Sequence, residues 1–120
     1  MITIENSKTE TINMNNIEVH NLTPHCINLY TDDGIIAIPS EGLARASMTS
    51  VPIGTINGVT VYKNEYGEVT GLPEEKSGHI YIVSALAANA VPHRPDVFIT
   101  NDAVRNEGGH IIGCRSWAHV

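Results

Sequence analysis

The order of apolar and polar residues along the chain is typical of short β-strands separated by turns. Residues 17–20 alternate apolar with polar side chains, and the turn sequence Thr31-Asp32-Asp33-Gly34 separates two short apolar runs. Such runs predict strands over residues 17–20, 26–30, 35–38, 79–84, 97–100 and 111–117. The sequence therefore predicts a mainly β protein with several hairpins.

The middle of the chain contains the strongest local signal. Asn57-Gly58 supplies the positive φ angles that a type I′ turn requires, so residues 52–56 and 59–62 are predicted to pair as a hairpin. Residues 43–50 fit either a helix or a strand whose polar side chains face outward, and we favour the strand.

One short helix is expected over residues 85–91, because its alanines are good helix formers, Ser84 can cap it and Pro92 ends it. Together the elements predict an α+β, mainly β fold, built as an antiparallel sheet or partly open barrel with hairpins and one short helix. Residues 16–120 are predicted to form this single domain, and the polar residues 1–15 a flexible N-terminal arm.

Composition adds two constraints. Aromatic residues make up only 5% of the 120 residues, so the core must be built from Val, Ile, Leu and Ala. Such a core buries less area per residue, and we therefore expect a homo-oligomer. The formal net charge of −6 argues against a large nucleic-acid surface, which needs clustered Lys and Arg. A small anion needs only two or three arginines and is not excluded.

Cysteines and hydropathy bear on location. Cys26 and Cys114 form no metal or redox spacing, so we expect two reduced, buried thiols and a cytoplasmic protein. The first residues lack the features of a signal peptide. No apolar run approaches the ~20 residues that span a membrane, so we expect no membrane partner.

Catalytic and metal motifs are missing from the sequence. The six histidines show no recognised metal spacing, although a site assembled in space stays an alternative. No cofactor motif or activated nucleophile is found, so we expect a protein that is not an enzyme and has no cofactor. A hydrolase that uses His93 and Asp96 is the weakest alternative, since one short loop cannot easily supply both roles.

Three of the four arginines and four of the six histidines lie in residues 79–120, which favours an anion site there. Guanidinium groups bind phosphate in two-pronged fashion, and aromatic rings can stack on a base. We predict a ligand site formed by His93, Arg94, Arg105 and Arg115, with Trp117 or Tyr81 as the stacking ring. Structural alternatives stay open: Asp96 can pair with Arg94, and Trp117 can pack in the core.

Several segments resemble a known group of proteins. These include Asn21-Leu22-Thr23-Pro24-His25, Tyr81-Ile82-Val83-Ser84 and Gly113-Cys114-Arg115. Across residues 17–118 the chain resembles a family of small proteins of bacteriophages, prophages and some bacteria, most of which have no assigned function. The resemblance carries no catalytic residues. It implies action in the host cytoplasm and, by analogy only, a role as a sponge that sequesters nucleotide signals of host defence.

Two functions follow as hypotheses. The first is a non-enzymatic phage accessory protein that binds a small phosphorylated or nucleotide-like ligand and sequesters a host immune signal. The second is a structural or protein-interaction module, either a virion accessory or an inhibitor of a host protein.

Overall fold

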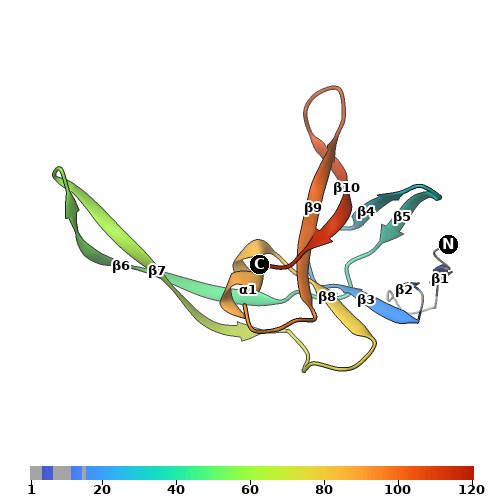
Figure 1. The fold of residues 1–120 in the computed structure, drawn as a ribbon, viewed down its shortest axis with the longest axis horizontal. Coiled ribbons are helices and arrows are strands. Elements are labelled where there is room, and N and C mark those ends of the chain that lie inside the picture. The colour runs from blue at the N-terminus through green and yellow to red at the C-terminus, as the bar shows by residue number, and fades with distance from the viewer. Residues whose placement is uncertain (1–3, 7–11, 15) are drawn as a thin grey trace.

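The computed structural model describes the backbone of residues 4–6 and 12–14, and all of residues 16–120. The described chain contains ten strands and one helix, and Figure 1 labels them. The strands are β1 (Ile4–Asn6), β2 (Ile12–Met14), β3 (Ile17–Asn21), β4 (Ile27–Thr31), β5 (Gly34–Ile38), β6 (Arg45–Ile56), β7 (Val59–Thr70), β8 (His79–Ile82), β9 (Val97–Arg105) and β10 (Ile111–Ala118), and the helix is α1 (Ala85–Ala90).

Eight of these strands form one curled sheet, a half-barrel, in the order β1-β2-β3-β8-β9-β10-β4-β5. The mainly β prediction and its partly open barrel are confirmed, but the sheet is mixed. β8 runs parallel to both β3 and β9, and β10 runs parallel to β4. The helix α1 connects β8 to β9, as expected for parallel neighbours, which need a crossover connection.

The core lies on both faces of the sheet, because side chains on a strand alternate between its faces. Ile82 packs with Val19, Ile38 and Cys114 inside the curl. Tyr81, the next residue along β8, belongs to a second cluster, which includes Ala87 and Ala88 of α1 and also Leu22, Ala44, Val83 and Val97. The single helix thus seals one face of the central strand, and the curl of the sheet seals the other.

Local predictions from the turn residues are confirmed. Asn57 and Gly58 have φ angles of 48° and 79°, and they join β6 to β7 as a hairpin. The ambiguous residues 43–50 contribute to strand β6, as favoured. Ser84 caps α1, since its hydroxyl oxygen accepts a hydrogen bond of 3.3 Å from the backbone nitrogen of Ala87.

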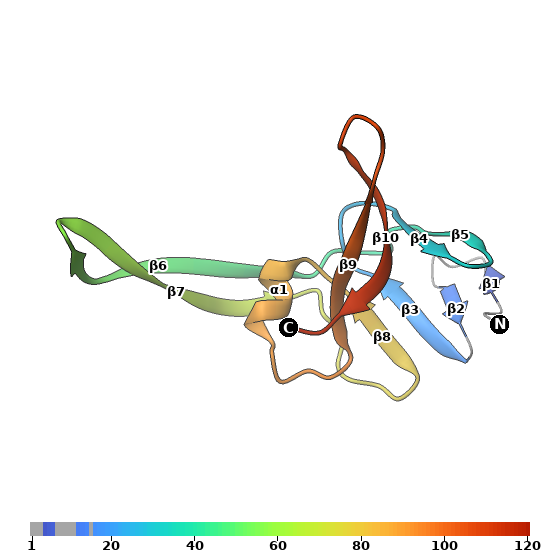
Figure 2. The ribbon, with the colours of Figure 1, turned by 45° about the horizontal axis from the view of Figure 1, so that its top comes forward.

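The hairpin of β6 and β7 is much longer than predicted, with twelve residues in each strand. It projects away from the half-barrel and touches it only near the base, where α1 contacts both strands (Figures 1 and 2). We call residues 46–69 the arm. None of them is buried, because beyond its base the two-stranded ribbon has no layer packed against either face.

The two cysteines differ in burial. Cys114 is buried as expected, but the expectation for Cys26 is wrong, since its side chain is exposed on the turn before β4.

The N-terminal segment 1–15, which was predicted to be flexible, includes residues 1–3, 7–11 and 15, and these lie outside the described residues. Between them, β1 and β2 extend the sheet from β3 as antiparallel strands. No helix among the described residues is long and apolar enough to cross a membrane.

Candidate ligand-binding hollow

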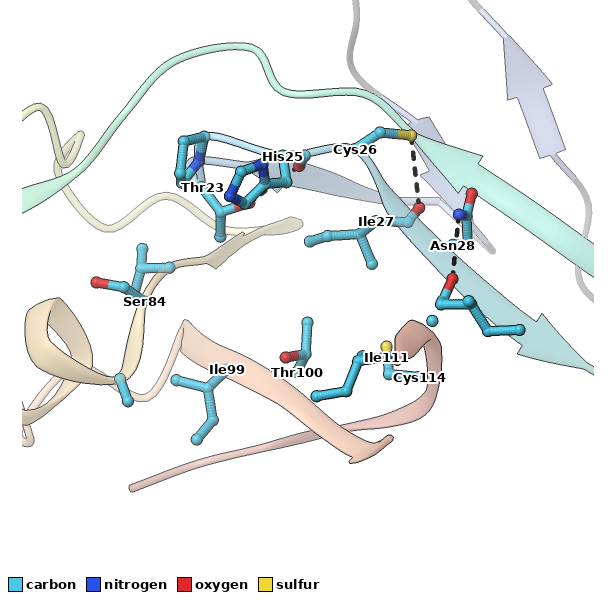
Figure 3. Close-up of a pocket in the computed structure, with 15 residues that line it drawn as sticks. Thr23, His25, Cys26, Ile27, Asn28, Ser84, Ile99, Thr100, Ile111 and Cys114 are labelled. Carbon is cyan, nitrogen blue, oxygen red and sulfur yellow. Dashed lines mark hydrogen bonds between the residues drawn. The ribbon is translucent and has the colours of Figure 1, made fainter. Parts of the chain in front are cut away.

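A hollow opens in the half-barrel between the turn that precedes β4 and the β9–β10 hairpin (Figure 3). Its volume is about 780 Å³. The turn at residues 23–28 forms one wall, the end of β8 and the start of α1 form the second, and β9 and β10 form the third. We refer to this cavity as the hollow.

One fully buried side chain holds the turn that forms the first wall. The amide nitrogen of Asn21 donates to the backbone carbonyls of His25 at 2.7 Å and Ile38 at 2.8 Å. Its amide oxygen accepts from the backbone nitrogen of Thr23 at 2.9 Å and from the Thr23 hydroxyl at 2.6 Å. Every hydrogen-bonding position of this amide is therefore used, and the loop is fixed to β5.

Long-range pairing brings the opposite walls together. Cys114 of β10 pairs in parallel register with Leu29 of β4. Beside this pair, the Asn28 amide donates to the carbonyl oxygen of Ile112 at 3.2 Å, a bond drawn in Figure 3. The side chain of a residue at position 113 would collide with Tyr30 and with the Asn28 carbonyl, so Gly113 permits this close approach.

The lining of the hollow is mostly apolar. Ile27, Val83 and Ile99 supply hydrocarbon surface, and a few polar groups are placed between them. The polar side chains on the walls are those of Thr23, His25, Cys26, Asn28, Ser84, Thr100 and Cys114. Burial raises the pKa of the Cys114 thiol, so this sulfur stays protonated near neutral pH. The hollow therefore offers hydroxyl, amide and imidazole groups and no fixed cation.

The predicted ligand residue Arg94 lies elsewhere and is engaged within the protein. Its Nε and one terminal nitrogen donate to the two carboxylate oxygens of Asp96, each at 2.8 Å. The same terminal nitrogen donates to the carbonyl oxygen of Pro73 at 2.9 Å. This two-pronged pair lowers the pKa of Asp96, chiefly through the hydrogen bonds from Arg94. Arg94 is thus paired with Asp96, which was the alternative left open from the sequence.

The other cationic candidates lie at separate places. Arg105 donates to the carbonyl oxygen of Gly109 at 2.7 Å within the β9–β10 loop. Arg115 is exposed on β10, with Asp102 3.7 Å away. His93 is exposed in the loop after α1. No contact between described residues joins any two of the three arginines, and none of the six predicted ligand residues lines the hollow.

The two aromatic candidates are parts of the core. Trp117 is half-buried against the cluster inside the curl. Tyr81 is only 4% exposed and its ring lies against His20, with ring centroids 4.9 Å apart. Burial and the neighbouring Asp96 raise the pKa of Tyr81. Tyr81 and Arg94, which are distant in the sequence, both contact Asp96: the backbone nitrogen of Tyr81 donates to the Asp96 carbonyl at 2.9 Å, and Arg94 donates to the Asp96 carboxylate.

A second group of polar side chains was missed in the sequence. Glu18, His20 and His79 approach one another on the outer face of β3 and β8. One potential metal-ligating atom of each, a carboxylate oxygen or a ring nitrogen, lies within 4.8 Å of the other two. We call these three residues the histidine cluster. A signal did exist: Glu18 and His20 alternate along one strand, so they share a face. What the sequence lacked was the parallel register that sets Glu18 opposite His79.

Comparison with known proteins gives no further guide to the site. No protein-family model matches the chain, and neither does any curated protein or solved structure.

Proposed function

We propose that this protein is a non-enzymatic binder of a small molecule, which it takes up in the hollow of the half-barrel. The observation that carries the proposal is the hollow itself. Its volume of about 780 Å³ lies within the range of roughly 300–1,000 Å³ typical of small-molecule sites. Its three walls come from distant parts of the chain, so the folded sheet fixes its shape before a ligand arrives.

The chemistry of the lining favours a ligand with an apolar or aromatic body. Ile27, Val83 and Ile99 provide the surface against which such a body packs. Thr23 and Thr100 stand on opposite walls and can meet polar groups at the ligand's edges. A nucleobase or nucleoside has this combination of a flat ring and a few hydrogen-bonding groups.

Binding is favoured over catalysis by the state of the reactive groups. The Cys114 thiol is held protonated by burial, which is unfavourable for a nucleophile. The Ser84 hydroxyl accepts the hydrogen bond that caps α1. Neither group has the neighbouring base that an activated nucleophile requires among its described contacts.

The phosphorylated ligand expected from the sequence stays a prediction, as do the phage context and the sequestration of a host signal. A nucleotide in the hollow would have to direct its phosphates outward, because the described lining contains no Lys or Arg. A binding test therefore compares uncharged nucleosides with the matching nucleotides.

The experiment measures the melting temperature of the protein against nucleobases, nucleosides, nucleoside monophosphates and cyclic dinucleotides. A ligand at about 100 times its Kd stabilises the folded state by about 2.7 kcal/mol, which is a readily measured shift. We expect at least one uncharged nucleobase or nucleoside to raise the melting temperature. The matching nucleotide is expected to raise it by no more than the uncharged compound does. The absence of a shift with every compound, at saturating concentration, contradicts the proposal.

Two variants test whether the ligand binds in the hollow, and the second of them is the matched control. Thr100→Phe places a ring in the hollow at an exposed strand position, so it blocks a ligand without opening the core. Thr70→Phe makes the same substitution at an exposed strand position outside the hollow. Thr100→Phe is expected to abolish the ligand-induced shift and Thr70→Phe to retain it.

A second candidate function, self-assembly through the arm, has its own observation. The chain has a surface of 7768 Å², whereas a compact chain of this mass exposes roughly 6,300 Å². Its radius of gyration is 16.9 Å, against about 13.6 Å for a compact domain of this length. The excess of about 1,500 Å² over the whole chain is larger than the roughly 800 Å² that each partner buries in a stable interface.

The occupant of this surface is proposed to be a second copy of the chain. Met48 pairs with Tyr66 and Pro52 with Tyr62 across the hairpin, so these side chains share one face. All four are exposed. The hydrogen-bonded pair of Ser50 and Asn64 lies between them on this face. A face with two exposed apolar pairs suits contact with a second copy in a symmetric homo-oligomer. An isolated two-stranded ribbon is marginally stable in water, so the arm gains most from such a partner.

Sedimentation velocity over a range of concentrations tests the second candidate. The wild-type chain is expected to form a defined oligomer. The double variant Tyr62→Ser, Tyr66→Ser is expected to associate more weakly, so that it dissociates at a higher protein concentration than the wild type. Thr60→Ser, which changes an exposed residue near the arm's tip, is the control and should associate normally. A wild-type chain that stays monomeric at high concentration contradicts self-assembly and leaves the hollow untouched as a site.

A further inference from the structure

The outer face of β3 and β8 carries a group of side chains that the proposed function does not use. Glu18 and His20 stand on β3, and His79 stands on β8 beside Glu18. This face is opposite to the inside of the curl, which holds Val19 and Ile82. None of the three residues of the histidine cluster lines the hollow, so the cluster is a separate place.

Three atoms of this cluster converge. The Nε2 of His20 lies 2.8 Å from the Nδ1 of His79. One carboxylate oxygen of Glu18 lies 3.0 Å from that Nδ1 and 3.5 Å from the Nε2 of His20. Two ligands each roughly 2.0–2.2 Å from one ion are separated by roughly 3.0 Å at a right angle and 3.4 Å at a tetrahedral angle. Two sides of the triangle, 3.0 and 3.5 Å, are close to these values, and the third, 2.8 Å between the two nitrogens, would lengthen slightly around an ion.

The two imidazoles meet through their edges. Their planes differ by 12° and their centroids are 5.1 Å apart, whereas the two nitrogens are only 2.8 Å apart. Each ring thus directs a nitrogen toward the other ring's nitrogen. A hydrogen bond between these nitrogens needs a hydrogen on one of them, and a bound ion would replace that hydrogen beside the Glu18 oxygen.

A fourth residue orients the first histidine. The Nδ1 of His20 lies 2.5 Å from a carboxylate oxygen of Glu41. A carboxylate on one ring nitrogen fixes the tautomer and leaves the other nitrogen as a ligand, an arrangement that recurs around zinc. Glu41 reaches this place because its own backbone nitrogen donates to the Asn21 carbonyl at 3.0 Å, which lays the loop after β5 along β3.

The surroundings favour a cation and keep a route open to it. The side chains of His20 and His79 are 12% and 17% exposed, whereas that of Glu18 is 38% exposed. The imidazoles are thus held by packing, with the Tyr81 ring against His20, while the carboxylate faces solvent. The protein's net charge of −6 adds a general attraction for cations.

We propose that Glu18, His20 and His79 bind one divalent transition-metal ion of the Zn²⁺ type, with Glu41 as the positioning residue of His20. Two imidazoles and one carboxylate select Zn²⁺ or Co²⁺ over Mg²⁺ and Ca²⁺, which prefer oxygen ligands. Three protein ligands leave at least one coordination position for water or a small molecule. The ion would tie β3, β8 and the Glu41 loop together at a place outside the lining of the hollow.

Titration of the full-length, chelator-treated protein with Co²⁺ and then Zn²⁺ tests this proposal. Calorimetry is expected to give one ion per chain, and bound Co²⁺ to give visible absorption that Zn²⁺ abolishes by displacement. Mg²⁺ is expected to give no heat of binding. A wild-type chain that binds neither Co²⁺ nor Zn²⁺ overturns the proposal.

Variants separate a built site from adventitious binding. His79→Gln and Glu18→Gln are expected to lose the one-to-one site, and Glu41→Gln to keep it with an affinity about 10- to 100-fold lower. His93→Gln and His25→Gln remove exposed histidines outside the cluster and are expected to bind like the wild type. Circular dichroism confirms that each variant is folded. Unchanged Zn²⁺ affinity in folded His79→Gln and Glu18→Gln overturns the proposal.

Discussion

The half-barrel and the arm solve the problem of stabilising a β-strand in opposite ways. Strand β8 is covered on both faces, by the curl of the sheet on one side and by α1 on the other. Strands β6 and β7 are more than twice as long, yet only the hydrogen bonds between them hold them together over most of their length. The difference teaches that length of pairing is no measure of stability, since burial supplies most of the free energy of folding.

The largest effect is expected where a core side chain is removed. Ile82 is fully buried at the centre of the sheet, so Ile82→Ala is expected to lower the free energy of unfolding by about 4 kcal/mol. Ile53 is 64% exposed on the arm, and Ile53→Ala should change it by less than about 0.5 kcal/mol. Urea unfolding measures both. Equal losses would mean that the arm is packed as tightly as the half-barrel.

A smaller loss is expected from the buried amide beside the hollow. Asn21→Ala removes four hydrogen bonds. It takes this donor from the buried Ile38 carbonyl, while the His25 carbonyl keeps a hydrogen bond of 3.1 Å from the Thr23 hydroxyl. We expect a loss of about 3 kcal/mol, because such buried groups cannot return to water. Asn64→Ala on the arm removes one exposed hydrogen bond, with Ser50, and is the control. A loss as small as that of Asn64→Ala contradicts the role given to Asn21.

The ion pair of Arg94 and Asp96 predicts a pH dependence. Since the folded pKa of Asp96 is lowered, its stabilisation is present above the ordinary carboxyl pKa near 3.8 and is lost as the pH falls through the lower folded value. Arg94→Met leaves Asp96, which is 8% exposed, without its partner, and is expected to cost about 2 kcal/mol at pH 7.

Melting temperatures at acid pH provide the control for this prediction. Melting temperatures between pH 7 and pH 2 are expected to fall less steeply in Arg94→Met than in the wild type. Arg115→Met breaks an exposed pair and should follow the wild-type curve. If Arg94→Met shows the full wild-type loss in acid, another carboxylate is responsible.

The smallest change in stability is expected on the arm, where association is affected instead. Tyr62 is 58% exposed, so Tyr62→Thr should alter the unfolding free energy of the monomer by less than about 0.5 kcal/mol. Hydrogen exchange at two protein concentrations is the sharper probe. Amides of β6 and β7 are expected to exchange faster than those of β8 in dilute protein and to slow down as the concentration rises. Equal protection of β6 and β8 in the monomer contradicts the comparison.

Features encoded by adjacent residues could be predicted from the sequence. The turn at Asn57-Gly58 follows from two residues that tolerate positive φ, and the cap at Ser84 from one hydroxyl before an alanine-rich segment. The pairing of Arg94 with Asp96 was one of two open alternatives, because two residues in one turn can reach each other whatever the rest of the chain does.

Features that depend on strand order could not be predicted. The hollow exists because β10 pairs with β4, which lies about eighty residues earlier in the chain, and the histidine cluster because β3 pairs with β8. Parallel pairings of this kind leave no local signal. The arginines were expected to converge, but Arg105 ends β9 and Arg115 stands on β10, and each interacts with a residue of the same hairpin.

Native mass spectrometry of the full-length chain, purified gently from the cells that produce it, tests most directly whether the hollow binds a small molecule. Wild-type protein is expected to carry an added mass of one small molecule per chain, and Thr100→Phe to carry none. Chains at the bare sequence mass in both proteins, from every source and growth condition tried, would contradict the account.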